Sequence, residues 1–579
     1  MKSSRADAVV VGLSAFVPAA LAASHVARVA DAAHDCGVAR VLGLDAQAWR
    51  ALDVVVGAVL AAVPVGTRAA RAALGGALVI ASAGAVLYGL ARRLLASCAD
   101  ASGERDGRPA LGLVVAAIAA VTPLVAAPWQ IEGAAVGGSV TGALLVLLPV
   151  ALVAGGAERA AWPAVAFALG LAVAHEPLAG ACALAGCGAY VATSALSRGA
   201  LVRSWGEQQT LFLVSALAGL TPLAIALVRV RLTGAPLGAV LASDWAGERG
   251  LSRAGSPWPF VSSELGVVLP LLTLGGVGLA MLVPAARPLA SALTAVTVAG
   301  FASAWLGAPL GPTRFGAPLL AGFAAASVLA GVSMQAIVRA VATARVPMAR
   351  ASAAMVVVLE LALPADMADE GLVRAAPRAS GAASAWDDAA WGALPFGTVV
   401  LVTDSMIFAR ARAARATGHL RDDVTLVPTF LHDARAWRAL AADPALLPLW
   451  RDLELVGVPG EASLSSLSSL RPLAMPYVPA WGKSIGKHLV PVTLFDRFEP
   501  EPRGASDRRH GLDAFEPIRE RLQRGIAGDP ELNAAAADLL RGRARLVTDL
   551  SSDPDLAART AADLRAFAPG EEHRGLGLP

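Results

Sequence analysis

Long apolar runs dominate the chain as far as residue 363, and short polar segments separate them. A helix needs about 20 apolar residues to cross the hydrocarbon core of a bilayer, and we count about eleven runs that approach this length. The runs are 8–27, 70–89, 110–127, 133–153, 163–174, 178–196, 210–228, 265–283, 289–306, 317–337 and 351–363. The pattern therefore predicts an α-helical polytopic membrane bundle.

Three apolar segments are shorter than a straight crossing requires. Runs 163–174 and 351–363 fall below the usual length, so their ends are the least defined by sequence. The run 54–65 has only about a dozen residues, which favours a re-entrant or interfacial helix over a full crossing.

Arginine placement predicts the orientation of the bundle. If all the crossings are kept, the arginines outside the crossings fall mostly on one side, as at Arg92, Arg93 and Arg159, and the positive-inside rule makes that side cytoplasmic. Three parts of the chain are then outside. They are the first loop (24–69, whose polar core is 31–66), the loop 229–263 and everything after residue 363. An even number of crossings would reverse the last assignment. Because a bundle follows the first run, we interpret it as a retained anchor rather than a cleaved signal peptide.

The composition becomes polar after residue 364, and this predicts a separate soluble domain. Residues 365–393 have the composition of a linker, and residues 394–579 follow as the domain. Thr398–Thr403 predicts a buried strand, Ile407–Thr417 a helix ending at Gly418, and Asp423–Pro428 a second strand. A strand, a helix and a strand within about thirty residues make a βαβ unit, so we expect a small α/β domain.

Several other stretches of this domain carry simpler signals. Ser463–Leu470 has the composition of a connector, whereas Pro517–Gly525 and Pro530–Leu540 have the spacing of amphipathic helices. Asp404 stands at the end of the first strand, a position shared by functional sites and by ordinary turns. No glycine-rich phosphate loop follows that strand, so the sequence does not support a nucleotide site.

Composition narrows the function classes. The chain is 56% hydrophobic with a mean hydropathy of +0.60, which argues against a soluble protein of 579 residues. Its net charge is only +3 and no basic tract is interleaved with aromatics, so nucleic-acid binding has no support. The cysteines form no CxxC pair or zinc spacing, and we assign no metal-ligating residues and no cofactor, whereas the sequence does not decide whether the chemistry needs a metal. The scarcity of lysine beside arginine and alanine suggests a GC-rich, bacterial genome.

Ionisable residues beside the predicted crossings are the candidate site. Each has an ordinary alternative: a solvated loop charge, a polar helix end or an arginine that snorkels to the interface. Glu132 follows Trp129 in a predicted short outer loop, where the tryptophan would anchor at the interface. The other candidates are Asp31, His34, Asp35, His175, Glu176, Arg229 and Arg231.

The order of several short motifs resembles a known family. Asp31, Leu42-Gly43, Pro64-Val65-Gly66 and a long helix ending in Arg92-Arg93 are similar to the first loop and following crossings of bacterial protein O-mannosyltransferase-like membrane proteins, relatives of the GT-C glycosyltransferases. Gly170–His175 resembles the family's helix that ends in histidine. In the soluble half, Val399–Asp404 followed by Asp422–Pro428 resembles the strand, acidic turn and Asp-Val strand beyond the bundle.

The resemblance implies a GT-C-like bundle at residues 1–364 in the bacterial cytoplasmic (inner) membrane. It also implies that the C-terminal domain is extracytoplasmic. It implies transfer of a sugar from a polyprenyl-phosphate donor to a protein or glycan acceptor at the outer face. Asp31 matches the position of the general base, which needs reach to the acceptor and a tuned pKa. For the leaving phosphate we expect Arg229 and Arg231, and for substrate contacts His34, Asp35, His175 and Glu176.

The sequence also departs from the family pattern. Where the family has Asp-x-Gly-Glu, this chain has Asp31-Ala32-Ala33-His34, and a later His-Pro-Pro-Gly turn is here Ala46-Gln47-Ala48-Trp49. Losing that turn removes rigidity that would preorganise a site. The alternative to an enzyme is thus a catalytically inactive membrane scaffold or transport component of an envelope glycan pathway.

Overall fold

The computed structural model describes most of the chain, and it divides the chain into two compact units. We call them the bundle, described between Arg5 and Ala375, and the α/β unit, described between Gly381 and Ala568. The described residues are 5–26, 49–64, 66, 68–101, 109–155, 161–198, 201–232, 257–306, 314–343, 349–375, 381–429, 440–527, 529–550 and 553–568.

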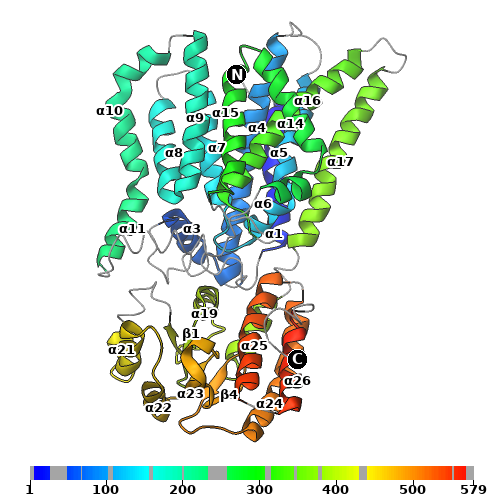
Figure 1. Cartoon of the computed structure of the whole chain (residues 1–579). Coiled ribbons are helices and arrows are strands. Elements are labelled where there is room, and N and C mark those ends of the chain that lie inside the picture. Colours follow the sequence, from blue (N-terminus) through cyan, green and yellow to red (C-terminus); the bar gives the residue numbers. More distant parts are fainter. Residues whose placement is uncertain are drawn as a thin grey trace. The chain divides into compact units, whose positions relative to one another are not determined.

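The bundle consists of helices, coloured blue to light green in Figure 1. They are α1 Arg5–Ser24, α3 Ala51–Ala61, α4 Arg68–Ala101, α5 Pro109–Val125, α6 Ala127–Ala134, α7 Val140–Gly155, α8 Ala161–His175, α9 Pro177–Arg198, α10 Leu201–Gly219, α11 Thr221–Leu232, α13 Trp258–Phe260, the π-helix η2 Val261–Leu265, α14 Val268–Leu282, α15 Arg287–Ala302, α16 Ala317–Thr343 and α17 Ala349–Ala375. Each of the predicted apolar runs overlaps one of these helices, and run 54–65 lies on the short helix α3.

Length and apolar composition identify the chain as a multi-pass membrane protein. Among the described residues, 5 helices are long and apolar enough to cross a bilayer, and 7 spans result if each of two bent helix pairs counts as one. Shorter apolar helices at 140–155, 162–175 and 268–282 accompany them. The predicted helical bundle is therefore confirmed, whereas the number of crossings stays a prediction.

Helix α16 forms the centre of the bundle. Its residues from Ala317 to Gln335 are buried, and it contacts α5, α7, α14, α15 and α17. The helix combines leucine and valine with alanine, glycine and serine, and small residues let neighbouring helices approach closely. Peripheral helices instead expose apolar side chains, such as Leu213 and Leu217 on α10, as expected of surfaces that face lipid.

The α/β unit contains a sheet of five strands in the order β2-β1-β3-β5-β4. Strands β1, β2 and β3 are parallel, and β5 is antiparallel to both β3 and β4. The elements are α18 Ala382–Trp391, β1 Val399–Val402, α19 Ser405–Thr417, β2 Thr425–Pro428, α21 Leu447–Leu455, α22 Glu461–Leu470, β3 Leu473–Met475, the 3-10 helix η4 Pro479–Trp481, α23 Gly482–Gly486, β4 Leu489–Pro491, β5 Asp496–Phe498, α24 Ala505–Ile526, α25 Pro530–Leu550 and α26 Pro554–Arg565. The predicted βαβ unit of β1, α19 and β2 is confirmed.

Helices cover both faces of this sheet because its strands are apolar on both sides. Alternate residues of β1 point to opposite faces. Val400 and Val402 pack in one core with residues of α18, α19, α24 and α25, whereas Val399 and Leu401 pack in another with residues of α21 and α22. The parallel part of the unit is thus a doubly wound α/β arrangement.

Two expectations for the region after the bundle differ from the structure. The stretch 365–393, expected to be a linker, is largely helical, because α17 continues to Ala375 and α18 buries Trp386 and Trp391 in the core of the α/β unit. Ser463–Leu470, expected to be a connector, belongs to helix α22. Leu464 and Leu467 are buried there at helical spacing, so burial of these leucines outweighs the weak helix propensity of the serines.

Candidate functional site

Arg50 is a buried cation directly before helix α3. Its side chain is only 2% exposed, and its backbone has φ 60° and ψ 32°. Among the described residues it is the only non-glycine residue with a positive φ. This left-handed conformation costs an ordinary residue on the order of 1–3 kcal/mol, and such strain is found most often where a side chain has a function.

The Arg50 guanidinium joins two helix junctions that are far away in sequence. Nη1 donates to the Gly137 carbonyl at 3.2 Å, and Nη2 donates to Ser139 Oγ and to Glu176 Oε2, each at 3.3 Å. The Arg50 backbone N–H also donates to the His175 carbonyl at 2.8 Å. The segment before α3 is therefore fixed against the α6–α7 and α8–α9 junctions.

Glu132 lies on helix α6 and is fully buried. Its Oε2 accepts from the Ser139 backbone N–H at 2.7 Å, and its Oε1 accepts from the Phe315 backbone N–H at 2.6 Å. The predicted outer loop is thus wrong: Trp129 and Glu132 belong to α6, a buried helix bent by 59° from α5. Hydrogen bonds from Trp129 Nε1 and Gln130 Nε2 to backbone carbonyls satisfy these two side-chain donors in their apolar setting.

Gly142 on α7 provides the space for the α8–α9 junction. A Cβ at this position would lie 2.6 Å from Ala317 Cβ and 3.3 Å from both Glu176 Oε2 and His175 Cδ2. A glycine therefore lets α7 approach α16 while both ionisable side chains pack against it. His175 is 1% exposed and Glu176 5% exposed, so neither is a solvated loop charge.

Two more buried ionisable residues stand close in sequence to residues of these junctions. Asp53 stands in the first turn of α3 and is 6% exposed, and Arg314 immediately precedes Phe315 and is 8% exposed. Within the described part of the chain, Asp53 Oδ2 and Arg314 Nη1 are buried atoms with no hydrogen-bond partner. A buried polar atom without a partner calls for an explanation, such as a catalytic role, a bound water or an ion.

We call Arg50, Asp53, Glu132, His175, Glu176 and Arg314 the polar cluster. They come from α3, α6, the α8–α9 junction and the segment before α16, which meet through the hydrogen bonds above. Arginine recognises phosphate, and carboxylates or imidazole transfer protons, so the set has the groups for acid–base chemistry beside an anion. Among the described residues, no three His, Cys, Asp or Glu side chains gather as metal ligands.

The cluster stands at the end of the bundle that the sequence alternation predicts to be outside. Near the start of α4, Gly76 lies against the Gly133 backbone beside Glu132. Near the other end of α4, Arg92 Nε donates to Asp7 Oδ1 at 3.4 Å, on the predicted cytoplasmic side. Helices α3 and α6 appear at the same end of the bundle in Figure 1. The side of the membrane itself stays a prediction.

The structure brings only part of the predicted site together. His175 and Glu176 belong to the polar cluster, as described above. Asp31, His34 and Asp35 lie outside the described residues. Arg229 and Arg231 lie on α11, where Arg231 is exposed, and no hydrogen bond described above joins Arg231 to the cluster.

Sequence reasoning missed Arg50, Asp53 and Arg314. The available signal was an arginine and an aspartate beside the apolar run 54–65, because ionisable residues at the edge of membrane segments are functional candidates by default. Arg314 had no comparable signal, since its relation to Glu132 depends on the contact through Phe315.

Comparisons with known proteins give several structural likenesses. No protein-family model matches the chain, and no curated protein matches it. A crystal structure of ArnT from Cupriavidus metallidurans bound to undecaprenyl phosphate is similar, with 16% identity, a TM-score of 0.49, and coverage of 82% of this chain and 94% of that one. The apo structure of ArnT from the same organism is also similar, with 17% identity, a TM-score of 0.48, and coverage of 86% and 98%. At these values the likeness does not assign a function to this chain.

Proposed function

We propose that the chain is an integral-membrane glycosyltransferase that transfers a sugar from a polyprenyl-phosphate donor to a protein or glycan acceptor at the outer face. The observation that supports this most is the meeting of Arg50, His175 and Glu176 at one end of an apolar bundle. Burying these groups is costly in a membrane protein unless they have partners or a function. The sequence resemblance to protein O-mannosyltransferase-like proteins suggests mannose as the sugar.

The two buried arginines have different roles in this proposal. Arg50 is held by Glu176, Ser139 and Gly137, so its charge is fixed in place and partly neutralised. Arg314 keeps a buried Nη1 that no described residue accepts from. A planar guanidinium suits phosphate oxygens, and the leaving phosphate gains negative charge as the sugar departs. Arg314 is therefore our candidate for the phosphate contact, and Arg50 is a positioning residue that fixes the segment before α3.

A carboxylate is needed as the base that removes the acceptor proton. The resemblance gives this role to Asp31, and His34 and Asp35 stand beside it in sequence. Asp53 adds a second candidate, since it is buried and follows Arg50 by one helical turn.

Binding of a lipid phosphate tests the phosphate contact. Purified full-length protein in detergent is mixed with undecaprenyl phosphate, and bound lipid is measured by native mass spectrometry. Undecaprenol, which lacks the phosphate, is the matched ligand. A hydrogen bond to a charged group contributes about 1.5–3 kcal/mol, so Arg314→Gln is expected to weaken binding by roughly 10- to 100-fold.

Arg287→Gln is the control variant, because Arg287 is exposed and donates from Nε to the Met281 carbonyl at 3.0 Å. It is expected to bind as the unaltered protein does. Equal binding of undecaprenol, or unchanged affinity in Arg314→Gln, would contradict the proposed contact. Binding without any sugar transfer would instead favour the scaffold or transport alternative.

A further inference from the structure

The α/β unit has a cavity at the point where the connections between its parallel strands change from one face of the sheet to the other. From β1 the chain crosses to β2 on one side through α19, and from β2 it returns past β1 to β3 through α21 and α22. The separate cores on the two faces of the sheet show that these connections use opposite faces. In open α/β sheets, ligands bind outside the carboxyl ends of the strands at this switch point.

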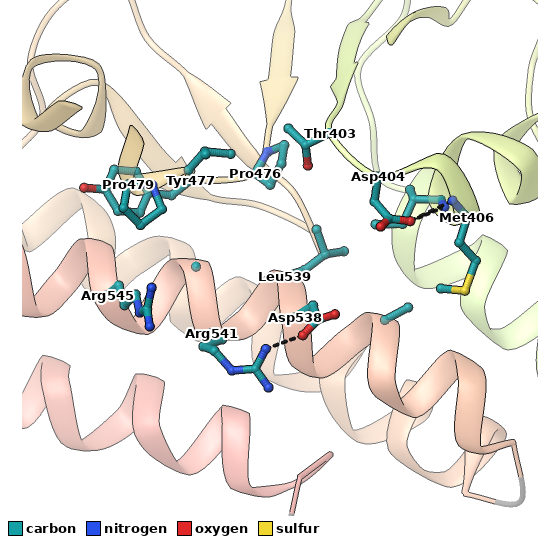
Figure 2. Close-up of a pocket in the computed structure, with 14 residues that line it drawn as sticks. Thr403, Asp404, Met406, Pro476, Tyr477, Pro479, Asp538, Leu539, Arg541 and Arg545 are labelled. Carbon is teal, nitrogen blue, oxygen red and sulfur yellow. Dashed lines mark hydrogen bonds and ion pairs between the residues drawn. The ribbon is translucent and has the colours of Figure 1, made fainter. Parts of the chain in front are cut away.

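The cavity has a volume of about 240 Å³ and lies at this position. Thr403 and Asp404 directly follow β1, and Pro476 and Tyr477 directly follow β3. Figure 2 shows helix α25 along the opposite wall, with Asp538, Leu539, Arg541 and Arg545 on it. Three separate elements thus build the cavity, and it falls where the topology predicts a binding site.

Close packing holds α25 against the end of β3. A Cβ at Gly542 would lie 2.6 Å from the Tyr477 carbonyl, so glycine is required for this approach. Tyr477 Oη donates to Asp549 Oδ2 at 3.1 Å, and burial together with this bond raises the pKa of the phenol to about 12. The hydroxyl is therefore committed to Asp549, and residue 477 offers mainly its apolar surface to the cavity.

Charge is distributed unequally along the cavity. Asp404 Oδ1 accepts from the backbone N–H groups of Met406 at 2.7 Å and Ile407 at 3.2 Å, which leaves Oδ2 to accept from a ligand. Arg541, paired with Asp538, and Arg545 contribute guanidinium groups from α25. In Figure 2, Asp404 lies at one end of the group and Arg545 and Pro479 at the other, with Pro476 and Leu539 between them.

These features select the size and chemistry of a ligand. Because Asp404 already occupies the N-terminus of α19, that helix end cannot cradle a phosphate as it does in nucleotide-binding folds. A cavity of about 240 Å³ is also smaller than the roughly 300–1,000 Å³ of drug-sized sites. A ligand that fits would carry an anionic group for the arginines, hydroxyl donors for Asp404 and a compact body with an apolar face.

We propose that this cavity binds an anionic monosaccharide, a sugar ring with a phosphate or a carboxylate, with the anion on Arg541 and Arg545 and ring hydroxyls on Asp404. The proposal concerns the α/β unit alone and does not depend on the transferase function proposed for the bundle. The same chemistry occurs in a free sugar and at the end of a glycan, so the experiment includes both.

The test uses saturation-transfer NMR and calorimetry on the full chain in detergent. The anionic probes are glucose 6-phosphate and glucuronate. Three matched ligands each lack one feature: glucose lacks the negative charge, inorganic phosphate lacks the sugar ring, and benzoate lacks the ring hydroxyls. Saturable binding of an anionic probe, at least tenfold tighter than each matched ligand, is expected. Methyl glucuronoside distinguishes the two sources: binding equal to glucuronate supports the end of a glycan, and weaker binding supports a free sugar.

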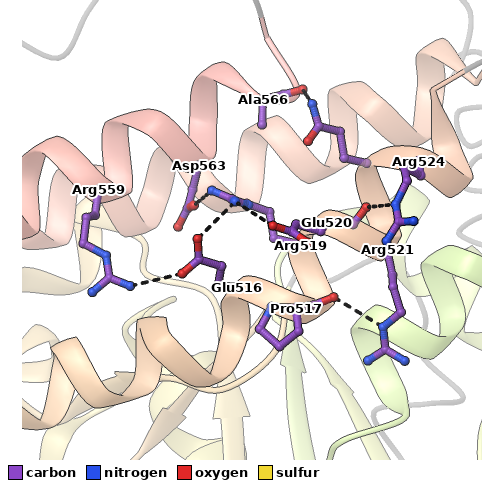
Figure 3. A network of polar contacts seen from close by, with 10 residues as sticks. Glu516, Pro517, Arg519, Glu520, Arg521, Arg524, Arg559, Asp563 and Ala566 are labelled. Carbon is purple, nitrogen blue, oxygen red and sulfur yellow. Dashed lines mark hydrogen bonds and ion pairs between the residues drawn. The ribbon is translucent and has the colours of Figure 1, made fainter.

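Variants then assign the binding to this cavity. Arg545→Gln and Asp404→Asn are each expected to weaken binding at least tenfold; the asparagine keeps the helix cap while removing the charge. Arg521→Gln is the control, because Arg521 is an exposed arginine that donates to the Pro517 carbonyl (Figure 3). Absence of binding by both anionic probes, equal binding of inorganic phosphate, or unchanged affinity in Arg545→Gln would overturn the proposal. None of these outcomes would affect the lipid-phosphate proposal for Arg314.

Discussion

Arg50 Nη2 and Glu176 Oε2 lie 3.3 Å apart, although 126 positions separate the two residues in the sequence. Both side chains are buried, at 2% and 7% exposure. Attraction between buried charges is strong, but so is the cost of removing each from water. The pair therefore fixes the first-loop segment to the α8–α9 junction and keeps two charges where an apolar bundle would otherwise exclude them.

The pair predicts a specific pattern of stability. Glu176→Gln leaves the Arg50 charge buried without its carboxylate, and breaking a buried pair costs about 3–5 kcal/mol. Arg50→Gln leaves the carboxylate in the same position. We expect both variants to lower the melting temperature of the purified protein, and the double variant to lose less than the sum of the two.

This double-mutant cycle is read by thermal unfolding in one detergent. A coupling energy of about 0.5–3 kcal/mol is expected for residues in direct contact. Strict additivity of the two substitutions would show that Arg50 and Glu176 do not interact, and the arrangement of the polar cluster would then be wrong.

Gly142→Ala tests the packing that places the cluster. The new methyl group would lie 2.6 Å from Ala317 Cβ and 3.3 Å from Glu176 Oε2, so α7 must shift against α16. Overpacking of this kind costs about 1–3 kcal/mol. We expect a lower melting temperature and weaker undecaprenyl phosphate binding.

Gly188→Ala on α9 is the control for this substitution. A Cβ at Gly188 meets no heavy atom within 4 Å, so the added methyl group should change neither property. If both variants behave like the unaltered protein, the close approach at Gly142 is not needed for the site.

Asp404 has a structural role that a separate substitution measures. Its side chain accepts from the backbone N–H groups of Met406 and Ile407 and so caps helix α19. Replacing such a cap with alanine costs about 0.5–2 kcal/mol, whereas asparagine is an equally good cap. Asp404→Ala should therefore raise hydrogen exchange in the first turns of α19 between about twofold and thirtyfold, and Asp404→Asn should not. Equal exchange in both variants would refute the cap.

The α/β unit should lose local stability in acid through Asp423. A side-chain hydrogen bond from Arg421, at 2.9 Å, and the backbone N–H of Gly397, at 2.7 Å, lower the pKa of this carboxyl group below its ordinary value. A lowered pKa means that the stabilisation is present above the unfolded pKa of about 3.9 and is lost as the pH falls through the folded pKa.

Hydrogen exchange of the segment around residues 395–402, corrected for the intrinsic effect of pH, measures this loss. Protection should fall as the pH is lowered below about 4 in the unaltered protein and depend less on pH in Asp423→Asn. Asp422→Asn, which changes the neighbouring exposed carboxyl group, is the control. The same pH dependence in Asp423→Asn as in the unaltered protein would contradict the assignment.

The sequence predicted the fold class because the signals for it are local. Apolar runs predicted the helices of the bundle, and the order strand, helix, Gly418, strand predicted β1, α19 and β2; Gly418 has φ 84°, a conformation that glycine adopts easily. The failures were also local. Serines hid helix α22, and a short polar segment after α5 hid the buried helix α6.

The site was less predictable because it depends on contacts between distant segments. His175 and Glu176 were identified as ionisable residues at a helix end, but nothing near them in sequence indicated Arg50 as their partner. Arg314 likewise gains its position through Phe315 and Glu132, which are separated by more than one crossing. Only the packing of the bundle brings these charges together.

Sugar transfer is the most direct test of the proposed function. The full chain is reconstituted in lipid vesicles with undecaprenyl-phosphate-linked mannose, followed by a panel carrying other sugars, and release of undecaprenyl phosphate is measured with an envelope extract as acceptor. We expect release with at least one donor, reduced at least a hundredfold in Asp31→Asn or in Asp53→Asn and at least tenfold in Arg314→Gln, but unchanged in Arg287→Gln. If no donor is consumed while undecaprenyl phosphate still binds, or if both aspartate variants retain full release, the transferase account is wrong.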